Sequence, residues 1–387
     1  MDLFKKYPKA GAGKLDRDKA LEVLDTNISW LKNYKNKVIE WLTNRCPKDV
    51  CLWNVYRLNP QIIPNQYYLT LQVNTTSNVF NGSVQIEVTA ATDVEYFIVH
   101  SADILDVTSG RVYSVNQKQE LEVKQMFHYS PLQFLVLRLS ERSSSGTYRL
   151  TFEFNSNLLL GGLSGLYKST YELNGETRGL AATQFQATSA RKAFPCFDEP
   201  SFRSHFDITL IHDNHNNLTI TNMPISNQIV DSPAIGWTTT SYAKSPLMVS
   251  YLVAIMVSDF ACRNDTSGEH KYDIRVCASV AKEYKLQYAL DMTPKIFTAF
   301  EEFLDYPYQL PKSDLVAIPD FAAGAMENWG LVKFRETALL WTPEEDLSSN
   351  KMSVNSIIAH ELAHMVTHFD TFPTNFNEFL CSGSEIC

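Results

Sequence analysis

Alternation of polar and apolar side chains governs the long stretch from Tyr56 to about Ile255. Residues 68–74 alternate strictly, and similar runs recur at 83–89, 131–139, 148–154, 206–212 and 237–242. Turns rich in Asn, Ser and Gly separate these runs, and no long helical period interrupts them. A period of two places successive side chains on opposite faces of a strand. The pattern therefore predicts an antiparallel β domain, a saddle or a sandwich, over residues 55–255.

Residues 256–387 mix strand and helix patterns. Strands are predicted at 272–278, 315–319 and 330–334, and a helix is predicted at 280–304. A second helix is predicted over 353–366, with Ser353 as its N-cap. This part of the chain is therefore expected to be α+β. The apolar face of the second helix is formed by Val354, Ile357, Ile358, Leu362 and Met365.

The first residues follow a different pattern. Apolar residues recur at steps of three and four over residues 16–43, which favours an amphipathic helix. Pro47 ends this pattern, and residues 46–54 are typical of a linker. Residues 1–46 are therefore interpreted as a separate helical segment.

Composition narrows the classes of partner and location. The chain has 387 residues, a formal net charge of -9 and an isoelectric point of about 5.5. An acidic surface argues against nucleic acid and anionic membranes as main partners. No run of about 18 apolar residues occurs, so no transmembrane helix is predicted. The lysine-containing start lacks the apolar core of a signal peptide.

The cysteines and the glycosylation sequons add little evidence about the class of the protein. None of the seven cysteines lies in a Cys-x-x-Cys pair, and their odd number leaves at least one thiol unpaired. Glycosylation sequons favour a glycoprotein only slightly, because a chain of this length contains several by chance. They stand at Asn27, Asn74, Asn81, Asn217 and Asn264.

Residues 360–364 read His-Glu-Leu-Ala-His within the second predicted helix. Positions i and i+4 project from one helical face, so His360 and His364 can bind one zinc ion. Glu361 then lies beside the metal as a candidate general base. A catalytic zinc site usually has three protein ligands, and this motif supplies two. The alternative is a pair of surface histidines on a core helix.

Residues 324–330 read Gly-Ala-Met-Glu-Asn-Trp-Gly. Glycines at both ends allow a backbone to approach closely, and a flanking strand can receive a peptide by β-augmentation. Glu327 is then placed to bind a substrate amine through a charge-assisted contact. The alternative is an ordinary turn with a solvated glutamate.

The two motifs together resemble the zinc aminopeptidases of the aminopeptidase N family. Further segments extend the resemblance from residue 55 to about residue 364. They are the opening strand near residues 56–73, Thr183-Gln184-Phe185-Gln186, the run from Ala190 to Pro200, Met248 to Ala254 with Ser258-Asp259-Phe260, Asp314 to Pro319, and Phe334-Arg335-Glu336-Thr337.

The resemblance implies a role for each matching residue. His360 and His364 match zinc ligands, which implies one Zn²⁺ per chain, and Glu361 matches the general base. Glu327 matches the residue that binds the substrate α-amine, with Gln186 in the partner position. Asp198, Glu199 and Pro200 are interpreted as structural. The strand that pairs with the substrate backbone is matched by Gly324, Ala325, Met326 and Asn328.

Departures from the family pattern begin after His364. The position of the family's third zinc ligand, a glutamate, is Gly383 here, and Glu378 and Glu385 stand near it. His368 is a possible substitute ligand, or a surface histidine. The family's intermediate-stabilising tyrosine has no counterpart. We therefore expect impaired activity and an exposed apolar face on the zinc helix.

The resemblance predicts an N-terminal β domain followed by the sheet half of a thermolysin-like catalytic domain over 256–387, truncated after the zinc helix. It implies removal of N-terminal residues from peptides, at the cell surface or outside the cell. Residues 1–46 resemble the family's C-terminal helix. Two alternatives stay open: a non-catalytic peptide-binding or receptor-type protein, and a non-functional truncated product.

Overall fold

The computed structural model describes residues 55–367. The chain divides into two compact units, Met1–Tyr56 and Arg57–Cys387, and the described residues fall almost entirely in the second. The predicted helical segment 1–46 lies outside the described residues, as do Glu378, Gly383, Glu385 and His368.

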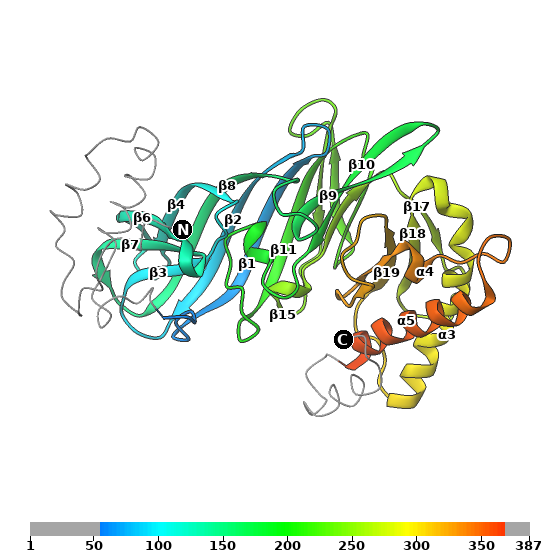
Figure 1. The fold of residues 1–387 in the computed structure, drawn as a ribbon. Coiled ribbons are helices and arrows are strands. Elements are labelled where there is room, and N and C mark those ends of the chain that lie inside the picture. Colours follow the sequence, from blue (N-terminus) through cyan, green and yellow to red (C-terminus); the bar gives the residue numbers. More distant parts are fainter. Residues whose placement is uncertain (1–54, 368–387) are drawn as a thin grey trace, which may run out of the picture. The chain divides into compact units, whose positions relative to one another are not determined.

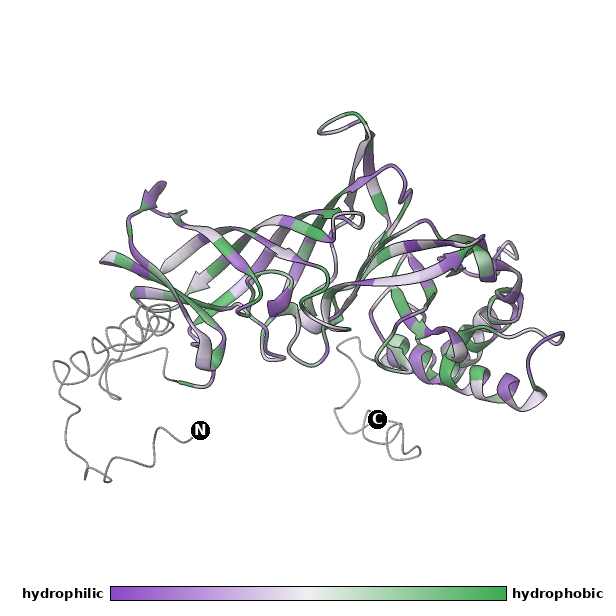
Figure 2. Ribbon diagram, turned by 45° about the horizontal axis from the view of Figure 1, so that its top comes forward, coloured by the Kyte–Doolittle hydropathy of each residue, from purple (hydrophilic) through white to green (hydrophobic). Residues whose placement is uncertain are grey.

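Among the described residues, nine strands form the largest sheet (Figure 1). These strands are β1 (Ile62–Asn74), β2 (Val79–Ala90), β4 (Asp106–Ser114), β5 (Gln119–Leu121), β8 (Gly146–Asn157), β11 (Arg203–Asp213), β13 (Ile225–Val230), β14 (Trp237–Tyr242) and β15 (Met248–Val249). Their order is β13-β14-β11-β1-β2-β8-β4-β5, and β15 pairs with β11. Hydrophobic and hydrophilic residues alternate along the long strands, as the sequence predicts (Figure 2).

Two smaller sheets complete the N-terminal β domain. The first contains β3 (Val94–His100), β6 (Val123–Tyr129) and β7 (Phe134–Ser143), in the order β3-β7-β6. The ring of Phe97 on β3 lies 5.0 Å from the ring of Tyr148 on β8, and both are buried, so this sheet packs against the largest one. The second contains β9 (Gly165–Leu173), β10 (Glu176–Gln184), β12 (Leu218–Thr221) and β16 (Ile255–Ser258), in the order β12-β16-β10-β9. The predicted β domain is confirmed.

One pairing differs from the antiparallel prediction. β1 pairs with β11 in parallel, with Gln66 opposite His205 and Val73 opposite His212. A hairpin joins only antiparallel neighbours, whereas the long connection between β1 and β11 allows the chain to return in the same direction. Alternation within a strand carries no information about the direction of its partner.

The following region is mixed, as predicted. Its sheet contains β17 (Ala261–Asn264), β18 (Asp273–Ala278), β19 (Lys312–Ile318), β20 (Ala325–Met326) and β21 (Leu331–Arg335). Their order is β17-β18-β19-β21-β20, with parallel pairs between β18 and β19 and between β19 and β21. The change of sheet falls between Ser258 at the end of β16 and Ala261, a few residues after position 255.

The helices begin at residues other than those predicted. Residues 280–285 form a 3₁₀ helix, η7 (Val280–Lys285), ahead of α3 (Gln287–Leu304). A short helix, α4 (Glu336–Leu339), follows β21. The zinc-motif helix α5 spans Ser348–Thr367, so Ser353 lies inside it and the predicted N-cap is wrong. A serine within a helix is tolerated, and the sequence pattern alone did not separate this position from a cap.

The apolar face of α5 is covered, and the expectation that it lies exposed is wrong. Val354, Ile358, Leu362 and Met365 are at most 1% exposed, and Ile357 is half-buried. Helices α3 and α4 contact α5, and α5 also contacts β20. Helices α3 and α4 and strand β20 therefore bury the apolar face of α5, which was expected from the sequence to lie exposed.

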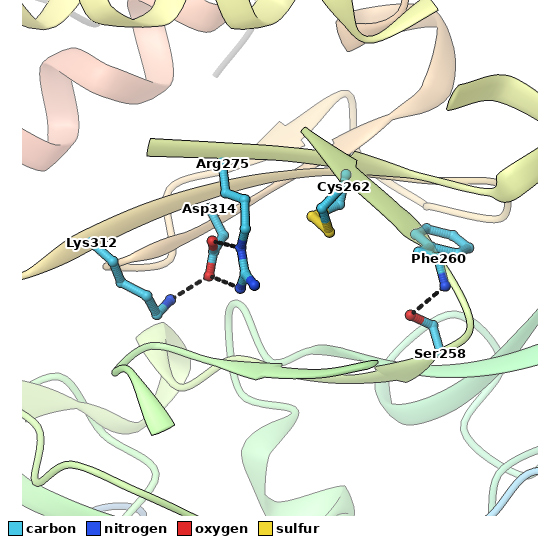
Figure 3. Close-up of a disulfide and its surroundings, with 7 residues drawn as sticks. Ser258, Phe260, Cys262, Arg275, Lys312 and Asp314 are labelled. Carbon is cyan, nitrogen blue, oxygen red and sulfur yellow. Dashed lines mark hydrogen bonds and ion pairs between the residues drawn. A yellow bond between two sulfur atoms is a disulfide. The ribbon is translucent and has the colours of Figure 1, made fainter. Parts of the chain in front are cut away.

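Polar side chains connect the β domain to the mixed sheet of β17 to β21. Asn222, which follows β12, donates from Nδ2 to the carbonyl of Trp329 over 2.8 Å. Lys312 on β19 donates from Nζ to the carbonyl oxygens of Thr221 over 2.7 Å and Gly330 over 2.6 Å. It also contacts Asp314, which accepts a bidentate pair of bonds from Arg275 (Figure 3).

A disulfide joins β17 and β18, two neighbouring strands of the mixed sheet. Cys262 on β17 lies opposite Cys277 on β18, and their sulfur atoms are bonded (Figure 3). Cys196 is a buried free thiol. The other cysteines lie outside the described residues.

Candidate active site

Helix α5 brings the two motif histidines together. The Nε2 atoms of His360 and His364 lie 3.2 Å apart, and their ring centroids are 4.8 Å apart. This closeness follows from their spacing of four residues on one helical face. Both side chains are half-buried, so solvent and small ions can reach them.

Glu361 lies on the same helix and is 6% exposed. Its Oε2 atom is buried and has no hydrogen-bond partner among the described residues. Burial, together with the smaller effect of the nearby Glu327 charge, raises the pKa of Glu361 to about 8. An ionised Glu361 therefore requires a positive charge or a proton donor beside it.

The Gly324–Gly330 segment forms a tight hairpin beside α5. Ala325 and Met326 form β20, which pairs antiparallel with β21. The carbonyl of Gly324 accepts a hydrogen bond from the backbone N–H of Arg335 over 2.9 Å. The hairpin thus holds the short strand that the resemblance assigned to substrate backbone binding.

Asn328 fixes the turn that follows β20. It is fully buried and donates from Nδ2 to the carbonyl of Leu252 over 3.1 Å and that of Tyr251 over 3.3 Å. Its neighbour Glu327 is half-buried, and the charge of Glu327 acts on Glu361. The structure therefore brings together the two motifs, which are separated by about thirty residues in sequence.

Gln186 follows the end of β10 and is exposed. The peptide bond between Gln186 and Ala187 is cis. Two residues earlier, Gln184 is buried and its Oε1 atom lies 3.4 Å from the Nζ atom of Lys333. Since Lys333 lies opposite Met326 on the hairpin, the Gln184–Gln186 segment is anchored beside the Glu327 turn.

The run Asp198-Glu199-Pro200 has structural contacts. Asp198 accepts from the Nε atom of Arg191 over 2.9 Å and from the hydroxyl of Ser250 over 2.9 Å. Glu199 accepts from the backbone N–H of Leu58 over 2.8 Å. These carboxylates tie separate segments of the β domain together, which supports their structural interpretation.

The donors on α5 suit a zinc ion. For a tetrahedral site with Zn–N bonds of about 2.0–2.1 Å, two ligand nitrogens lie about 3.3 Å apart. The two Nε2 atoms lie 3.2 Å apart, and an unpartnered buried carboxylate stands on the same helix. Within residues 55–367, no cluster of three or more His, Cys, Asp or Glu side chains forms a metal site.

A cavity of about 420 Å³ lies away from these groups. It is lined by residues of several strands, among them β12, β14, β18 and β19, including Tyr242, Arg275 and Asp314. None of the candidate catalytic or zinc-binding residues lines it, so the cavity is not the candidate active site.

Comparison with known families and proteins decides the assignment. Residues 63–252 match the Peptidase M1 N-terminal domain, and residues 288–367 match the Peptidase family M1 domain. The chain belongs to peptidase family M1. The second match ends with helix α5, and the Gly324–Gly330 hairpin also lies inside it.

Curated relatives of this M1 chain carry aminopeptidase names. It is 34% identical over 316 residues to the glutamyl aminopeptidase of Bos taurus, covering 81% of this chain and 32% of that protein. It is 38% identical over 320 residues to the endoplasmic reticulum aminopeptidase 2 of Bos taurus, covering 82% and 33%. It is 38% identical over 328 residues to the aminopeptidase N of Bos taurus, covering 81% and 33%. The chain spans about a third of the length of these relatives.

Two features of this M1 chain were not found from its sequence. One is Lys333, which is 1% exposed although lysine is rarely buried. Its only signal was a charged residue within the otherwise apolar run Leu-Val-Lys-Phe. The other is Tyr251, whose pKa is raised by burial and by the charge of Glu327.

In the described part, no helix is long and apolar enough to cross a membrane.

Proposed function

We propose that this protein is a zinc-dependent aminopeptidase that removes N-terminal residues from peptides. The observation that carries the proposal is that helix α5, which carries His360, Glu361 and His364, contacts strand β20, which Glu327 directly follows. Membership of peptidase family M1 and the aminopeptidase names of the relatives support the same reaction.

His360 and His364 would hold one Zn²⁺ ion through their Nε2 atoms, with a third ligand outside the described residues. When bound, the ion would polarise the carbonyl of the scissile peptide bond and lower the pKa of a water molecule. Beside such a positive charge, the Glu361 carboxylate would be ionised. Glu361 can then accept a proton at its unpartnered Oε2 atom and donate it to the leaving amine.

Glu327 would define the exopeptidase specificity. Its half-buried carboxylate can bind an α-ammonium group, and the family resemblance assigns Gln186 as its neutral partner. The backbone of Gly324, Ala325 and Met326 would pair with the first residues of the peptide. Since an ammonium fixed at Glu327 sets the distance to Glu361, cleavage would occur after one residue.

The disulfide supports a proposal about the cellular compartment in which the protein works. The Cys262–Cys277 disulfide persists in oxidising environments, which favours a secreted or cell-surface location. The sequons at Asn81, Asn217 and Asn264 lie on exposed side chains, which glycosylation requires. The peptide partner is proposed from the M1 relatives, and the acidic charge still argues against nucleic acid.

An aminoacyl fluorogenic substrate tests the proposal on the full chain with added zinc. We expect hydrolysis that needs zinc, that falls at least about a hundredfold in Glu361→Gln, and that falls in Glu327→Ala mainly through a higher KM. Glu302→Gln, an exposed change on α3, is the matched control and keeps the wild-type rate.

Two results would contradict the proposal in different ways. Hydrolysis that survives both substitutions would remove Glu361 and Glu327 from the reaction. Peptide binding at Glu327 with no turnover would favour the alternative of a non-catalytic peptide-binding protein. The expectation of impaired turnover stays a prediction, and the same assay measures it.

A further inference from the structure

The cavity of about 420 Å³ is lined both by the β domain and by the mixed sheet of β17 to β21. Small-molecule sites in proteins commonly have volumes of about 300–1,000 Å³, so this cavity is large enough for a ligand. None of the candidate catalytic or zinc-binding residues lines it. A ligand here would therefore occupy a site that the proposed reaction does not use.

Three of the lining residues together carry an excess of positive charge. Arg275 donates from Nε and Nη2 to the two oxygens of Asp314, over 2.6 Å and 3.0 Å (Figure 3). Lys312 donates to the same carboxylate over 2.6 Å, so two cations share one anion. The Nη1 atom of Arg275 has no hydrogen-bond partner among the described residues. An unused guanidinium nitrogen beside an excess positive charge suits a ligand carboxylate.

Two buried hydroxyl groups also line the cavity. Tyr242 is 5% exposed and Thr219 is 4% exposed. The two hydroxyls are near each other, but neither has a hydrogen-bond partner of normal geometry among the described residues. A buried polar group without a partner costs free energy, and a ligand oxygen that accepts from it removes this cost. The two hydroxyls therefore provide further donors for a ligand carboxylate.

A carboxylate on the strand of Arg275 provides the opposite charge. Asp273 and Arg275 both line the cavity from β18, and residues two apart project from the same face of a strand. Their Cα atoms are about 6.7 Å apart at the usual rise of a strand. A zwitterion whose two charged groups share one carbon atom, with a hydrogen bond of about 2.8 Å at each end, spans a comparable length. The Asp273 side chain is exposed and makes no hydrogen bond within the described part of the chain, so it is available to an ammonium group.

Apolar side chains complete the lining. Ile220 and Ile274 are buried, and Met223 is half-buried. Apolar ligand surface that contacts these side chains is removed from water, which is favourable. The cavity thus combines donors for a carboxylate, an acceptor for an ammonium group and an apolar surface.

We propose that this cavity binds a free α-amino acid with an apolar side chain. Its carboxylate accepts hydrogen bonds from Arg275, Tyr242 and Thr219. Its ammonium group binds Asp273, and its side chain packs against the apolar lining. A simple ion would use only part of this lining, whereas an apolar amino acid matches all three parts. The site is separate from Glu327 and does not depend on the proposed reaction.

Titration calorimetry with L-leucine tests the site on the full chain. The Glu327→Ala variant is used, because it lacks the carboxylate proposed to bind an amine at the candidate active site. We expect one L-leucine to bind per chain. 3-Methylbutylamine lacks the carboxylate of leucine, and 4-methylpentanoate lacks its ammonium group. Each should bind at least about tenfold more weakly, because hydrogen bonds between charged groups are lost.

Two further substitutions in this background remove one contact each. Tyr242→Phe removes a hydroxyl and keeps the ring, so leucine should bind at least about tenfold more weakly. The affinity for 3-methylbutylamine should not change, since that ligand has no carboxylate. Asp273→Asn should weaken leucine binding and leave 4-methylpentanoate binding unchanged. Tyr113→Phe and Asp103→Asn are the matched controls, because these exposed side chains lie outside the cavity, and both should keep the original affinity.

Either of two results would overturn the amino acid site. Absence of leucine binding in Glu327→Ala would mean that the cavity holds only water. Leucine binding that neither Tyr242→Phe nor Asp273→Asn weakens would place the amino acid elsewhere. Thermal unfolding checks each variant, and if Tyr242→Phe does not fold, the exposed change Asp273→Asn decides with its pair of ligands. Hydrolysis is not the readout, so a failure here leaves the proposed aminopeptidase activity standing.

Discussion

His100 shows how burial determines the behaviour of a single residue. Its side chain is 3% exposed, and its Nδ1 atom accepts a hydrogen bond from the backbone N–H of Asp198 over 3.2 Å. Burial, with the positive charges of Arg191 and Arg57, lowers the pKa of His100 from 6.5 to about 3. The imidazole is therefore neutral in the folded chain at every pH above that value.

This neutral histidine predicts a loss of stability in acid. Between about pH 3 and 6.5 the unfolded chain binds a proton at His100 and the folded chain does not. The free energy of unfolding therefore falls as pH decreases through this window, by up to about 1.4 kcal/mol per pH unit. In His100→Asn this contribution disappears, so the variant should lose less stability than wild type between about pH 6 and pH 4.

Urea unfolding at several pH values measures the effect. His215→Asn is the control, because His215 is exposed and should follow the wild-type curve. Parallel curves for wild type and His100→Asn would show that the histidine is protonated in the folded chain.

Single residues of the candidate site were predictable where a motif specifies them. His360, Glu361 and Glu327 stand in fixed local patterns, and helix α5 of the first motif contacts strand β20 of the second, while their roles stay predictions. Lys333 was not predictable as a neighbour of Gln184, because that contact joins residues far apart in sequence. Local patterns identify chemistry, whereas the groups that tune it come from the tertiary fold.

At the scale of elements, helices and strands were predicted better than their ends. The α5 pattern was recognised, but the helix begins at Ser348, five residues before the predicted cap at Ser353. The burial of its apolar face depends on α3 and α4, which the periodicity of α5 alone does not reveal. The direction of the β1–β11 pairing was missed for the same reason.

A disulfide joins β17 and β18. Cys262 and Cys277 are separated by 15 residues. Closing a loop of this length stabilises a fold by about 3 kcal/mol in the chain-entropy account. Replacing both cysteines by serine should therefore lower the free energy of unfolding by about that amount.

Chemical unfolding with and without a reductant measures this prediction. Reductant should destabilise the wild-type chain and leave the double variant almost unchanged. An equal effect of reductant on both proteins would assign the stabilisation to other cysteines.

At the scale of the whole molecule, closely packed backbone and buried polar side chains connect the β domain to the sheet of β17 to β21. Gly330 has a φ of 73°, and a Cβ atom there would lie 2.1 Å from the carbonyl oxygen of Asn222. Lys312 and Asn222 also make hydrogen bonds to this turn. The two parts of the chain therefore meet through backbone that cannot move apart without losing several contacts.

Gly330→Ala should be strongly destabilising. The left-handed conformation alone costs an alanine about 1–2 kcal/mol, and the collision with backbone adds to it. Gly175→Ala is the matched control, because Gly175 has a φ of 81° and open space around its Cβ position. We expect Gly330→Ala to cost more than twice as much as the control in thermal unfolding. Similar costs would mean that the connection relaxes easily.

The parallel pairing of β1 with β11 has a consequence for the newly made chain. β2 follows β1 and can pair with it at once, but the other edge of β1 waits for residues 203–213. At about 5–20 residues per second, synthesis leaves that edge open for on the order of ten seconds. Leu69, Leu71 and Val73 would be incompletely covered during this interval. A ribosome that pauses before Arg203 would prolong the time in which the nascent chain is open to association with its neighbours.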